Sequence, residues 1–366
     1  MAGLERLEPA VLSTCVARKI CLIKPSSLGD VVQTLPVLHG LRSRFPKAHI
    51  AWVVNKSYSP LIWPISAIDE IIEFDREGCR GRGFGAASRF GSFLKYLRAQ
   101  RFDLALDLQG LLRSGMMCLA TGARLRIGLM TAREGARFFC THWIDDRPVE
   151  QGAVVRYWKV LEQFGIGQAQ KSFGLELTDE ERGEAKKQLS GLMRPIIAIN
   201  PGARWETKRW PAEKFANAVG RTIRQNGFGS VVVLGGPGEE LFAEQVVSQL
   251  GMPARNLCGK TSLRQLAALL AECDLLVTND SGPMHLAAAV GTKTVSIFTC
   301  TSPARAAPFG EGHRIVQTKV WCKESYVKTC NRMECMDDVS IEPVMHEIET
   351  SLNLRTSSDP KASRAA

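Results

Sequence analysis

The sequence predicts an α/β protein of two Rossmann-like domains, each containing a doubly wound parallel sheet. Short runs rich in β-branched residues alternate with helical patterns along most of the chain, which is the βαβ order of parallel sheets. The alternation occurs twice, on either side of residues 165–178, where Gly and Gln interrupt it. A chain of 366 residues is long enough for two domains, each with a core of its own.

The expected strands and helices follow from this alternation. Strands are expected at residues 19–24, 49–55, 70–74, 103–109 and 125–130 in the first half of the chain. In the second half they are expected at residues 195–200, 230–236, 254–259, 274–280 and 293–298. The helices expected between them are residues 31–44, 88–100, 211–226, 239–250 and 262–273.

The domain boundaries are expected where the pattern stops. We expect an N-terminal extension at 1–18, a first domain at 19–168 and a second domain at 176–339. A helix at 340–353 could pack back across the first domain. The last residues, RTSSDPKASRAA, have no apolar content to bury, so a disordered tail is expected at 354–366.

Composition narrows the class of protein. No apolar run approaches the roughly 20 residues that cross a bilayer, and the first nine residues carry two glutamates and a proline rather than a secretory signal. We therefore expect a cytoplasmic protein. The 11 cysteines are an odd number and mostly stand singly in apolar segments, as small hydrophobes do, rather than as a disulfide framework.

The net charge of +10 is unevenly distributed along the chain. Residues 1–165 contain 23 basic and 15 acidic residues, so +8 of the charge lies in the first half. The arginines Arg76, Arg80, Arg82 and Arg89 stand close together, which favours an anionic partner over a surface that is charged only for solubility. Nucleic acid is a weaker alternative, because no zinc-finger spacing, aromatic RNA-binding strand or basic zipper accompanies the charge.

Ligands of open parallel sheets bind at the carboxyl ends of the strands, so the turns that follow the strands are the places to search. The first turn, PSSLGD, contains Gly29, which permits a tight backbone path, and Asp30. From spacing alone, a plain helix N-cap is the simpler interpretation of Asp30. The turn contains neither a G-x-G-x-x-G fingerprint nor a Walker phosphate loop.

The turn NPGARWETKRWP opens the second half. Gly202 lets the backbone approach a ligand, Lys208 and Arg209 supply positive charge, and Trp210 with Pro211 leads into the next helix. A diphosphate would fit here, although a Lys-Arg pair before a helix is often only solvated surface.

Two later strand ends also carry polar residues. Glu239 could accept the hydroxyls of a ribose, or could simply complement a helix dipole. Asn279, Asp280 and Ser281 are more than capping requires, and the Ala-rich helix behind them points its amides at any anion bound there. His285, one turn into that helix, is a candidate ligand contact or a structural histidine.

Three motifs in this order resemble one family. SLGDVVQTLPVL after the first strand, NPGA with KRWP in the second domain, and NDSGPMHLAAAVGTKTVSIF resemble the ADP-heptose lipopolysaccharide heptosyltransferases of glycosyltransferase family 9. The resemblance runs from about residue 19 to about residue 350 and includes FDLALDLQGLLRS and TAREGAR. It implies a GT-B fold, with the acceptor on the first domain and the nucleotide sugar on the second, across a cleft. It also implies inverting, metal-independent transfer of heptose from ADP-heptose to the Kdo or heptose of a lipid A precursor, at the inner face of the inner membrane, with no cofactor.

The resemblance also implies roles for individual residues. Asp30 corresponds to the general base, Lys208 and the helix start at 281–285 to the groups that stabilise the leaving ADP, and Arg133 to an acceptor-side arginine. Glu239 corresponds to the ribose contact. The expected donor contacts are Ser27, Gly29, Gly202, Arg204, Lys208, Glu239, Asp280, Ser281, Gly282 and His285. From charge alone, Arg76, Arg80 and Arg82 are added as a mobile gate over the acceptor.

Several alternatives stay open at this point. Arg204 departs from the small polar residue expected in the family's phosphate loop, and the Gly/Arg-rich stretch at 76–89 leaves room for another donor or glycan acceptor. Cys322, Cys330 and Cys335 fall short of the four ligands of structural zinc and are expected to be packing thiols. A nicotinamide-dependent oxidoreductase would need the missing glycine fingerprint. A basic surface-binding protein would leave the acids at three strand ends unexplained.

Overall fold

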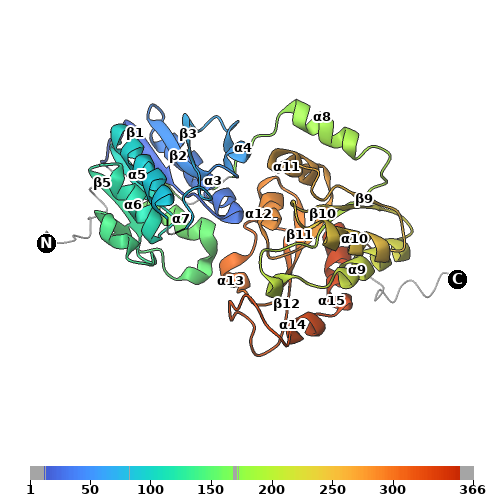
Figure 1. The fold of residues 1–366 in the computed structure, drawn as a ribbon. Coiled ribbons are helices and arrows are strands. Elements are labelled where there is room, and N and C mark those ends of the chain that lie inside the picture. The colour runs from blue at the N-terminus through green and yellow to red at the C-terminus, as the bar shows by residue number, and fades with distance from the viewer. Residues whose placement is uncertain (1–11, 13, 82, 168–170, 172, 355–366) are drawn as a thin grey trace. The chain divides into compact units, whose positions relative to one another are not determined.

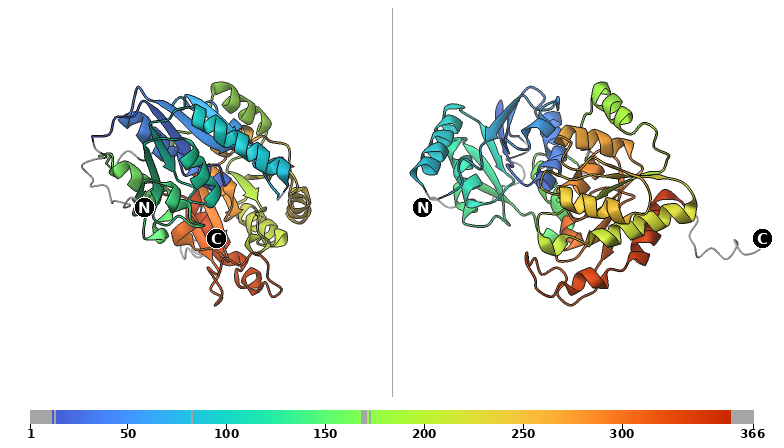
Figure 2. Two further views of the ribbon diagram at one scale, coloured as in Figure 1. Left: turned by 60° about the vertical axis from the view of Figure 1, so that its left-hand side comes forward. Right: turned by 45° about the vertical axis from the view of Figure 1, so that its right-hand side comes forward.

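The computed structural model describes residues 12, 14–81, 83–167, 171 and 173–354. The chain divides into two compact units, unit 1 (residues 1–176) and unit 2 (residues 177–366). Each unit contains one parallel sheet with helices packed on it (Figures 1 and 2). None of the described helices is both long and apolar enough to cross a membrane.

The sheet of unit 1 has six parallel strands in the order β3-β2-β1-β4-β5-β6. The strands are β1 Lys19–Ile23, β2 His49–Asn55, β3 Glu70–Phe74, β4 Leu104–Asp107, β5 Leu125–Leu129 and β6 His142–Ile144. β1 pairs with both β2 and β4, so Ile23 lies beside Val53 on one side and Asp107 on the other. The strand order reverses between β1 and β4, which is where ligands of such sheets bind.

Helices follow the strands of unit 1. They are α2 Leu28–Val32, α3 Leu35–Arg44, α4 Ser59–Ile62, α5 Phe84–Ala99, α6 Leu112–Ala120 and α7 Gly152–Glu162, with the 3-10 turns η1 Ala136–Phe139 and η2 Val149–Gln151. Residues of β1 and β2 form one core with Leu97 of α5 and Met117 of α6. α3 packs against α7 so closely that a Cβ at Gly40 would lie 2.2 Å from Leu161.

Unit 2 repeats this architecture, with the sheet order β12-β11-β10-β7-β8-β9. The strands are β7 Ile196–Asn200, β8 Ser230–Val233, β9 Ala254–Asn256, β10 Leu275–Asn279, β11 Lys293–Phe298 and β12 Arg314–Gln317. The helices are α8 Asp179–Gln188, α9 Ala212–Asn226, α10 Glu240–Gln249, α11 Leu263–Glu272, α12 Gly282–Ala289, α13 Pro303–Ala306, α14 Glu334–Asp338 and α15 Ile341–Leu352, with the turn η4 Glu206–Lys208. Trp210, just before α9, is fully buried and packs edge-on against Phe215.

The ten expected strands are all present, and two were missed. β6 and β12 lie at the edges of the sheets and have only three and four residues, too few to show a clear alternation. The helix expected at 31–44 is interrupted at Gln33 and Thr34, between α2 and α3. The stretches 1–11 and 355–366, for which an extension and a disordered tail were expected, lie outside the described residues.

The C-terminal helix belongs to unit 2. Val344 and Ile348 of α15 join the core that Trp210 and Phe215 form under the second sheet. Lys293 at the start of β11 also donates a hydrogen bond to the carbonyl of Ser351 at 2.9 Å. The sequence allowed this helix to pack back across the first domain. In the structure, the apolar residues Val344 and Ile348 of the helix are buried in the core of unit 2.

Candidate functional site

Asp30 is the third residue of α2, and Ser27 is the N-cap. The Ser27 backbone N–H and hydroxyl donate to Asp30 Oδ2 at 3.0 and 2.8 Å, so the acid closes a capping box instead of occupying the N-cap position that its spacing suggested. Its other oxygen, Oδ1, accepts from the Tyr157 hydroxyl at 3.0 Å and lies 3.4 Å from Lys24 Nζ. Capping therefore uses only one of the two carboxylate oxygens.

The Asp30 carboxylate is ionised across the physiological range. Burial opposes ionisation, but Lys24 and the hydrogen bonds from Ser27 and Tyr157 outweigh it and lower the pKa of Asp30 to about 2. The side chain keeps 35% of its surface exposed. An ionised, partly accessible carboxylate at the carboxyl end of β1 can accept a proton from a bound hydroxyl group.

Asp107 is a second acid at the strand reversal of unit 1, and sequence analysis did not single it out. It ends β4 and is fully buried, with Oδ1 accepting from the N–H groups of Gln109 and Gly110, both at 3.0 Å. Oδ2 accepts from the Ser114 hydroxyl, also at 3.0 Å. Burial raises the pKa of Asp107 to about 6, although these hydrogen bonds act in the opposite direction.

The raised pKa of Asp107 predicts a loss of stability with rising pH. The folded state binds this proton more tightly than the unfolded state, so the contribution is complete below the ordinary Asp pKa of 3.8 and is lost as pH rises through about 6. The difference corresponds to about 3 kcal/mol of unfolding free energy. Guanidinium unfolding of wild type and Asp107→Asn between about pH 4 and pH 7 measures it. The decline should be absent in Asp107→Asn, and an unchanged slope would assign the decline to other groups.

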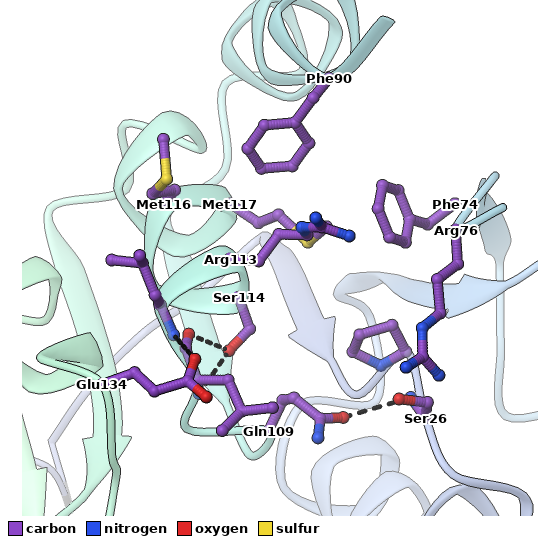
Figure 3. Close-up of a pocket in the computed structure, with 13 residues that line it drawn as sticks. Ser26, Phe74, Arg76, Phe90, Gln109, Arg113, Ser114, Met116, Met117 and Glu134 are labelled. Atoms are coloured by element: carbon purple, nitrogen blue, oxygen red, sulfur yellow. Dashed lines mark hydrogen bonds between the residues drawn. The ribbon is translucent and has the colours of Figure 1, made fainter. Parts of the chain in front are cut away.

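A pocket of about 490 Å³ lies beside the turn that carries Asp30 (Figure 3). Phe74, Phe90 and Met117 contribute apolar walls, and Arg76 and Arg113 project into it. The Arg113 guanidinium lies 5.7 Å from the centre of the Phe90 ring, within range of a cation–π contact. The pocket can therefore hold an anionic group together with an apolar or sugar-ring surface.

The arginines expected at the acceptor are not all found at this pocket. Arg76 lines it, whereas Arg80 is exposed and lies 3.6 Å from Glu77. Arg133 is exposed and is not among the lining residues, although its neighbour Glu134 is. Arg82 lies outside the described residues. Arg113 was missed, because it stands alone in an otherwise uncharged helix and not in the arginine-rich stretch.

In unit 2, an ion pair joins the two loops at the strand reversal. Lys208, at the end of η4, donates to Asp280 Oδ2 at 2.6 Å, and the Thr301 hydroxyl donates to the same oxygen at 2.6 Å. Lys208 Nζ also lies 4.6 Å from the centre of the Trp205 ring. Sequence placed both Lys208 and Asp280 in the site, and the structure brings them into direct contact.

Glu239 folds over the loop that follows β7. It is the N-cap of α10, and its Oε2 accepts from the Gly236 N–H at 2.8 Å. A Cβ at Gly202 would lie 2.0 Å from Glu239 Oε1, so only glycine at position 202 leaves room for this carboxylate. Asn279 closes the same loop, donating to the Pro201 carbonyl at 2.7 Å and accepting from the Trp210 N–H at 3.1 Å.

Gly202→Ala should displace the Glu239 carboxylate, which is the flexible end of its side chain. If this carboxylate contacts a ribose, loss of the contact should weaken ADP binding by about 10-fold or more. Isothermal titration calorimetry with ADP measures this change in affinity. Gly236→Ala is the matched control, since its added Cβ would lie 3.8 Å from Glu239 Oε2. Equal ADP affinity in wild type and Gly202→Ala would contradict the contact.

The other expected donor residues lie at the start of α12, on the loop after β7 and at the start of α2. Ser281 is the N-cap of α12, which begins at Gly282, and its hydroxyl lies 3.2 Å from the Thr278 hydroxyl. His285 is buried one turn into α12. Arg204 lines a second hollow, of about 470 Å³, together with Trp205, Arg209 and Lys328. Ser27 and Gly29 lie in unit 1, with the Gly29 carbonyl accepting from the Gln33 N–H.

The thiols of the C-terminal loop do not share one environment. Cys335 is buried, and this burial raises its pKa to about 11. Hydrogen bonds from the backbone of Met333 and Arg332 lower the pKa of Cys330. Cys322 is partly exposed, and all 11 cysteines are free. Among the residues described by the structure, no cluster of three or more His, Cys, Asp or Glu side chains has the arrangement of a metal site.

The sequence is similar to known heptosyltransferases. Residues 90–336 match glycosyltransferase family 9 (heptosyltransferase). Lipopolysaccharide core heptosyltransferase OpsX of Haemophilus influenzae is 25% identical over 352 residues, which cover 92% of this chain and 98% of the relative. Lipopolysaccharide heptosyltransferase 1 of Pseudomonas aeruginosa is 26% identical, covering 87% of this chain and 89% of the relative.

Solved structures agree with the sequence matches. The crystal structure of a family 9 glycosyltransferase from Veillonella parvula has a TM-score of 0.77 at 27% identity and covers 92% of this chain and 97% of that one. ADP-heptose lipopolysaccharide heptosyltransferase II of E. coli has a TM-score of 0.74 at 24% identity, covering 92% and 98%, and shows the same fold. The expected GT-B fold is thus confirmed. With its two parallel sheets and a family match over most of its length, this chain belongs to glycosyltransferase family 9, the heptosyltransferase family.

Proposed function

We propose that this enzyme transfers heptose from ADP-L-glycero-D-manno-heptose to the inner core of a lipopolysaccharide precursor, with Kdo or heptose as the accepting sugar. Its family and the heptosyltransferases it resembles over nearly their whole length support this reaction. The observation that carries the mechanism is the ionised Asp30 carboxylate on a turn whose residues Pro25 and Ser26 line the pocket that contains Arg76 and Arg113. The proposed reaction inverts the configuration at the anomeric carbon.

Asp30 is the proposed general base. The acceptor hydroxyl oxygen attacks the anomeric carbon, the bond from that carbon to the ADP oxygen breaks, and the hydroxyl proton passes to Asp30. A carboxylate with a pKa of about 2 is a weak base toward a free alcohol. The hydroxyl becomes acidic only as its oxygen bonds to the oxocarbenium-like carbon, so proton transfer should accompany bond formation rather than precede it.

Unit 2 is the proposed nucleotide-sugar domain. Lys208 would stabilise the negative charge that develops on the leaving diphosphate, and the N–H groups at the start of α12 would contribute to this stabilisation. Glu239 would accept the hydroxyls of the adenosine ribose, and Asp280 would face the heptose or shape its pocket. Because Asp280 already binds Lys208, donor binding should redistribute this ion pair rather than meet an unpaired lysine.

Unit 1 is the proposed acceptor domain. The pocket with Arg76 and Arg113 would hold anionic groups of the acceptor, and the expected contributions of Arg80, Arg82 and Arg133 stay predictions. The excess of +8 in residues 1–165 also favours peripheral association with an anionic membrane surface. Sedimentation with vesicles containing anionic or only zwitterionic lipids tests that association, which should weaken as salt rises.

The donor is tested by thermal stabilisation with ADP, UDP, GDP and NAD. A ligand that binds only the folded protein raises its melting temperature, so ADP alone should produce a shift. A preference for UDP or GDP would keep a family 9 transferase but replace the donor, which is the main alternative. Stabilisation by NAD alone would contradict the proposal.

The acceptor is tested with precursors of increasing length. Incubation with ADP-heptose and lipid A carrying Kdo, or Kdo with one heptose, followed by mass spectrometry should show addition of heptose to one of them. Failure with both, together with binding of ADP, would point to another glycan acceptor.

A further inference from the structure

We propose that Lys24 and Tyr157 are positioning residues that hold the Asp30 carboxylate in its reactive orientation and ionised state. This inference rests on the proposed role of Asp30 as the base. Lys24 follows β1 directly, and Tyr157 lies on α7, 127 residues away from Asp30. Neither residue belongs to the motifs that pointed to the site.

The burial of Lys24 requires an explanation. Only 3% of its side chain is exposed, and taking an ammonium group out of water costs several kcal/mol unless its N–H groups and charge are satisfied. Lys24 Nζ donates to the Tyr157 hydroxyl at 2.7 Å and to the Leu108 carbonyl at 3.0 Å, and lies 3.4 Å from Asp30 Oδ1. Asp30 is the carboxylate paired with Lys24 in the described structure, so it supplies the compensating charge.

The direction of the hydrogen bonds follows from chemistry. An ammonium group can only donate, so the Tyr157 oxygen accepts from Lys24 and its own proton is directed to Asp30 Oδ1 at 3.0 Å. The Lys24 ammonium also lies 4.7 Å from the centre of the Tyr157 ring. Burial raises the pKa of Tyr157 to about 12, so the hydroxyl keeps this proton. The Tyr157 hydroxyl thus connects the buried Lys24 ammonium group to Asp30 Oδ1 through two hydrogen bonds.

Both oxygens of Asp30 are therefore fixed. Ser27 holds Oδ2 from the helix start, while Lys24 and Tyr157 hold Oδ1 from inside the unit. All these groups favour the charged carboxylate, because each donates a hydrogen bond to it or carries positive charge. The carboxylate can turn away from a substrate only by breaking several of these contacts.

Two other charged groups interact with this cluster. Asp107, at the end of β4, interacts with Lys24, and Arg156 on α7 interacts with Tyr157. Arg156 is itself bonded to the buried Asp146 at 3.0 Å through Nε. Since Asp107 has a pKa of about 6, its titration could overlap that of Asp30, and the experiment is therefore repeated with Asp107→Asn as background.

The direct test is a carboxyl carbon NMR titration of the full-length protein labelled at aspartate, with the Asp30 signal identified by its loss in Asp30→Asn. In wild type this signal should stay in the carboxylate position down to about pH 4. In Lys24→Met the midpoint should rise by about 1 to 3 pH units. Tyr157→Phe should give a smaller rise and provides the test if Lys24→Met does not fold.

Lys19→Met is the matched control. Lys19 begins the same strand, donates to the Gln100 side chain at 3.0 Å and lies over the Phe102 ring, but it is at the opposite end of β1 from Asp30. It should leave the Asp30 titration unchanged. An Asp30 midpoint equal in wild type, Lys24→Met and Tyr157→Phe would overturn the inference.

Kinetics separate this inference from the proposed function. The acid limb of the pH profile of kcat/KM for heptose transfer reports the free-enzyme base, so it should move upward in Lys24→Met and stay in place in Lys19→Met. A shifted NMR midpoint in an enzyme that transfers no heptose would reject the proposed function and keep the pairing. Normal transfer with an unmoved acid limb and midpoint would reject the positioning role alone.

Discussion

Asp30→Asn is expected to lower kcat for heptose transfer by about 100- to 10,000-fold, the range that general bases contribute. The amide has nearly the same shape, but it cannot accept the proton of the acceptor hydroxyl. ADP affinity should change little, because the contacts proposed for the diphosphate and the ribose belong to unit 2. Steady-state kinetics with ADP-heptose, together with calorimetric titration of ADP, measure the two effects separately.

Asp145→Asn is a suitable control for this experiment. Asp145 is a partly exposed acid of the same unit that pairs with Arg147 at 2.7 Å, and it has no role in the proposed reaction. It should retain wild-type kcat. Wild-type turnover in Asp30→Asn would remove Asp30 as the base, and loss of ADP binding in that variant would show that the substitution disturbs more than proton transfer.

Lys208→Met is expected to weaken ADP binding by about 10- to 150-fold, which corresponds to a charge-assisted contact of about 1.5 to 3 kcal/mol. It should also destabilise the fold by about 3 to 5 kcal/mol, because it leaves Asp280 buried without its cation. The side chain of Asp280 is only 7% exposed, and Thr301 would be its remaining donor among the contacts described. Calorimetry and guanidinium unfolding measure the two quantities.

A double variant separates the two roles of Lys208. Lys208→Met with Asp280→Asn removes the uncompensated charge, so it should recover much of the lost stability. ADP affinity should stay low if Lys208 itself contacts the diphosphate. Recovery of wild-type affinity in the double variant would mean that Lys208 acts only by pairing with Asp280.

Much of the fold was predictable because parallel strands buried on both faces are short apolar runs with β-branched residues. Most of the ten predicted strands have this pattern, although β3 and β9 also lie at sheet edges. β6 and β12 do not, since edge strands are shorter and less buried, as in the sequence RIVQ of β12, of which only Val316 is buried. The break between α2 and α3 was missed although Pro36 stands in the first turn of α3, a position that proline favours because it lacks the backbone N–H.

The candidate site was predictable where function depends on local sequence. Gly202 lies two residues after β7, and Asp30 and Glu239 lie seven and six residues after β1 and β8, so the rule that ligands bind at strand ends pointed to all three as candidates. Lys24 reads as the last residue of a strand, and Tyr157 as part of an amphipathic helix. Both residues matter because they contact Asp30. Tyr157 is 127 residues away from Asp30 along the chain, so only the folded structure reveals this contact.

The most direct test of the account is the anomeric configuration of the product formed from ADP-heptose and a Kdo-bearing lipid A precursor. Attack by the acceptor hydroxyl opposite the leaving ADP, assisted by Asp30, predicts a product of inverted configuration by NMR, formed by wild type and nearly absent with Asp30→Asn. A product that retains the donor configuration, or equal amounts of product from both proteins, would contradict it.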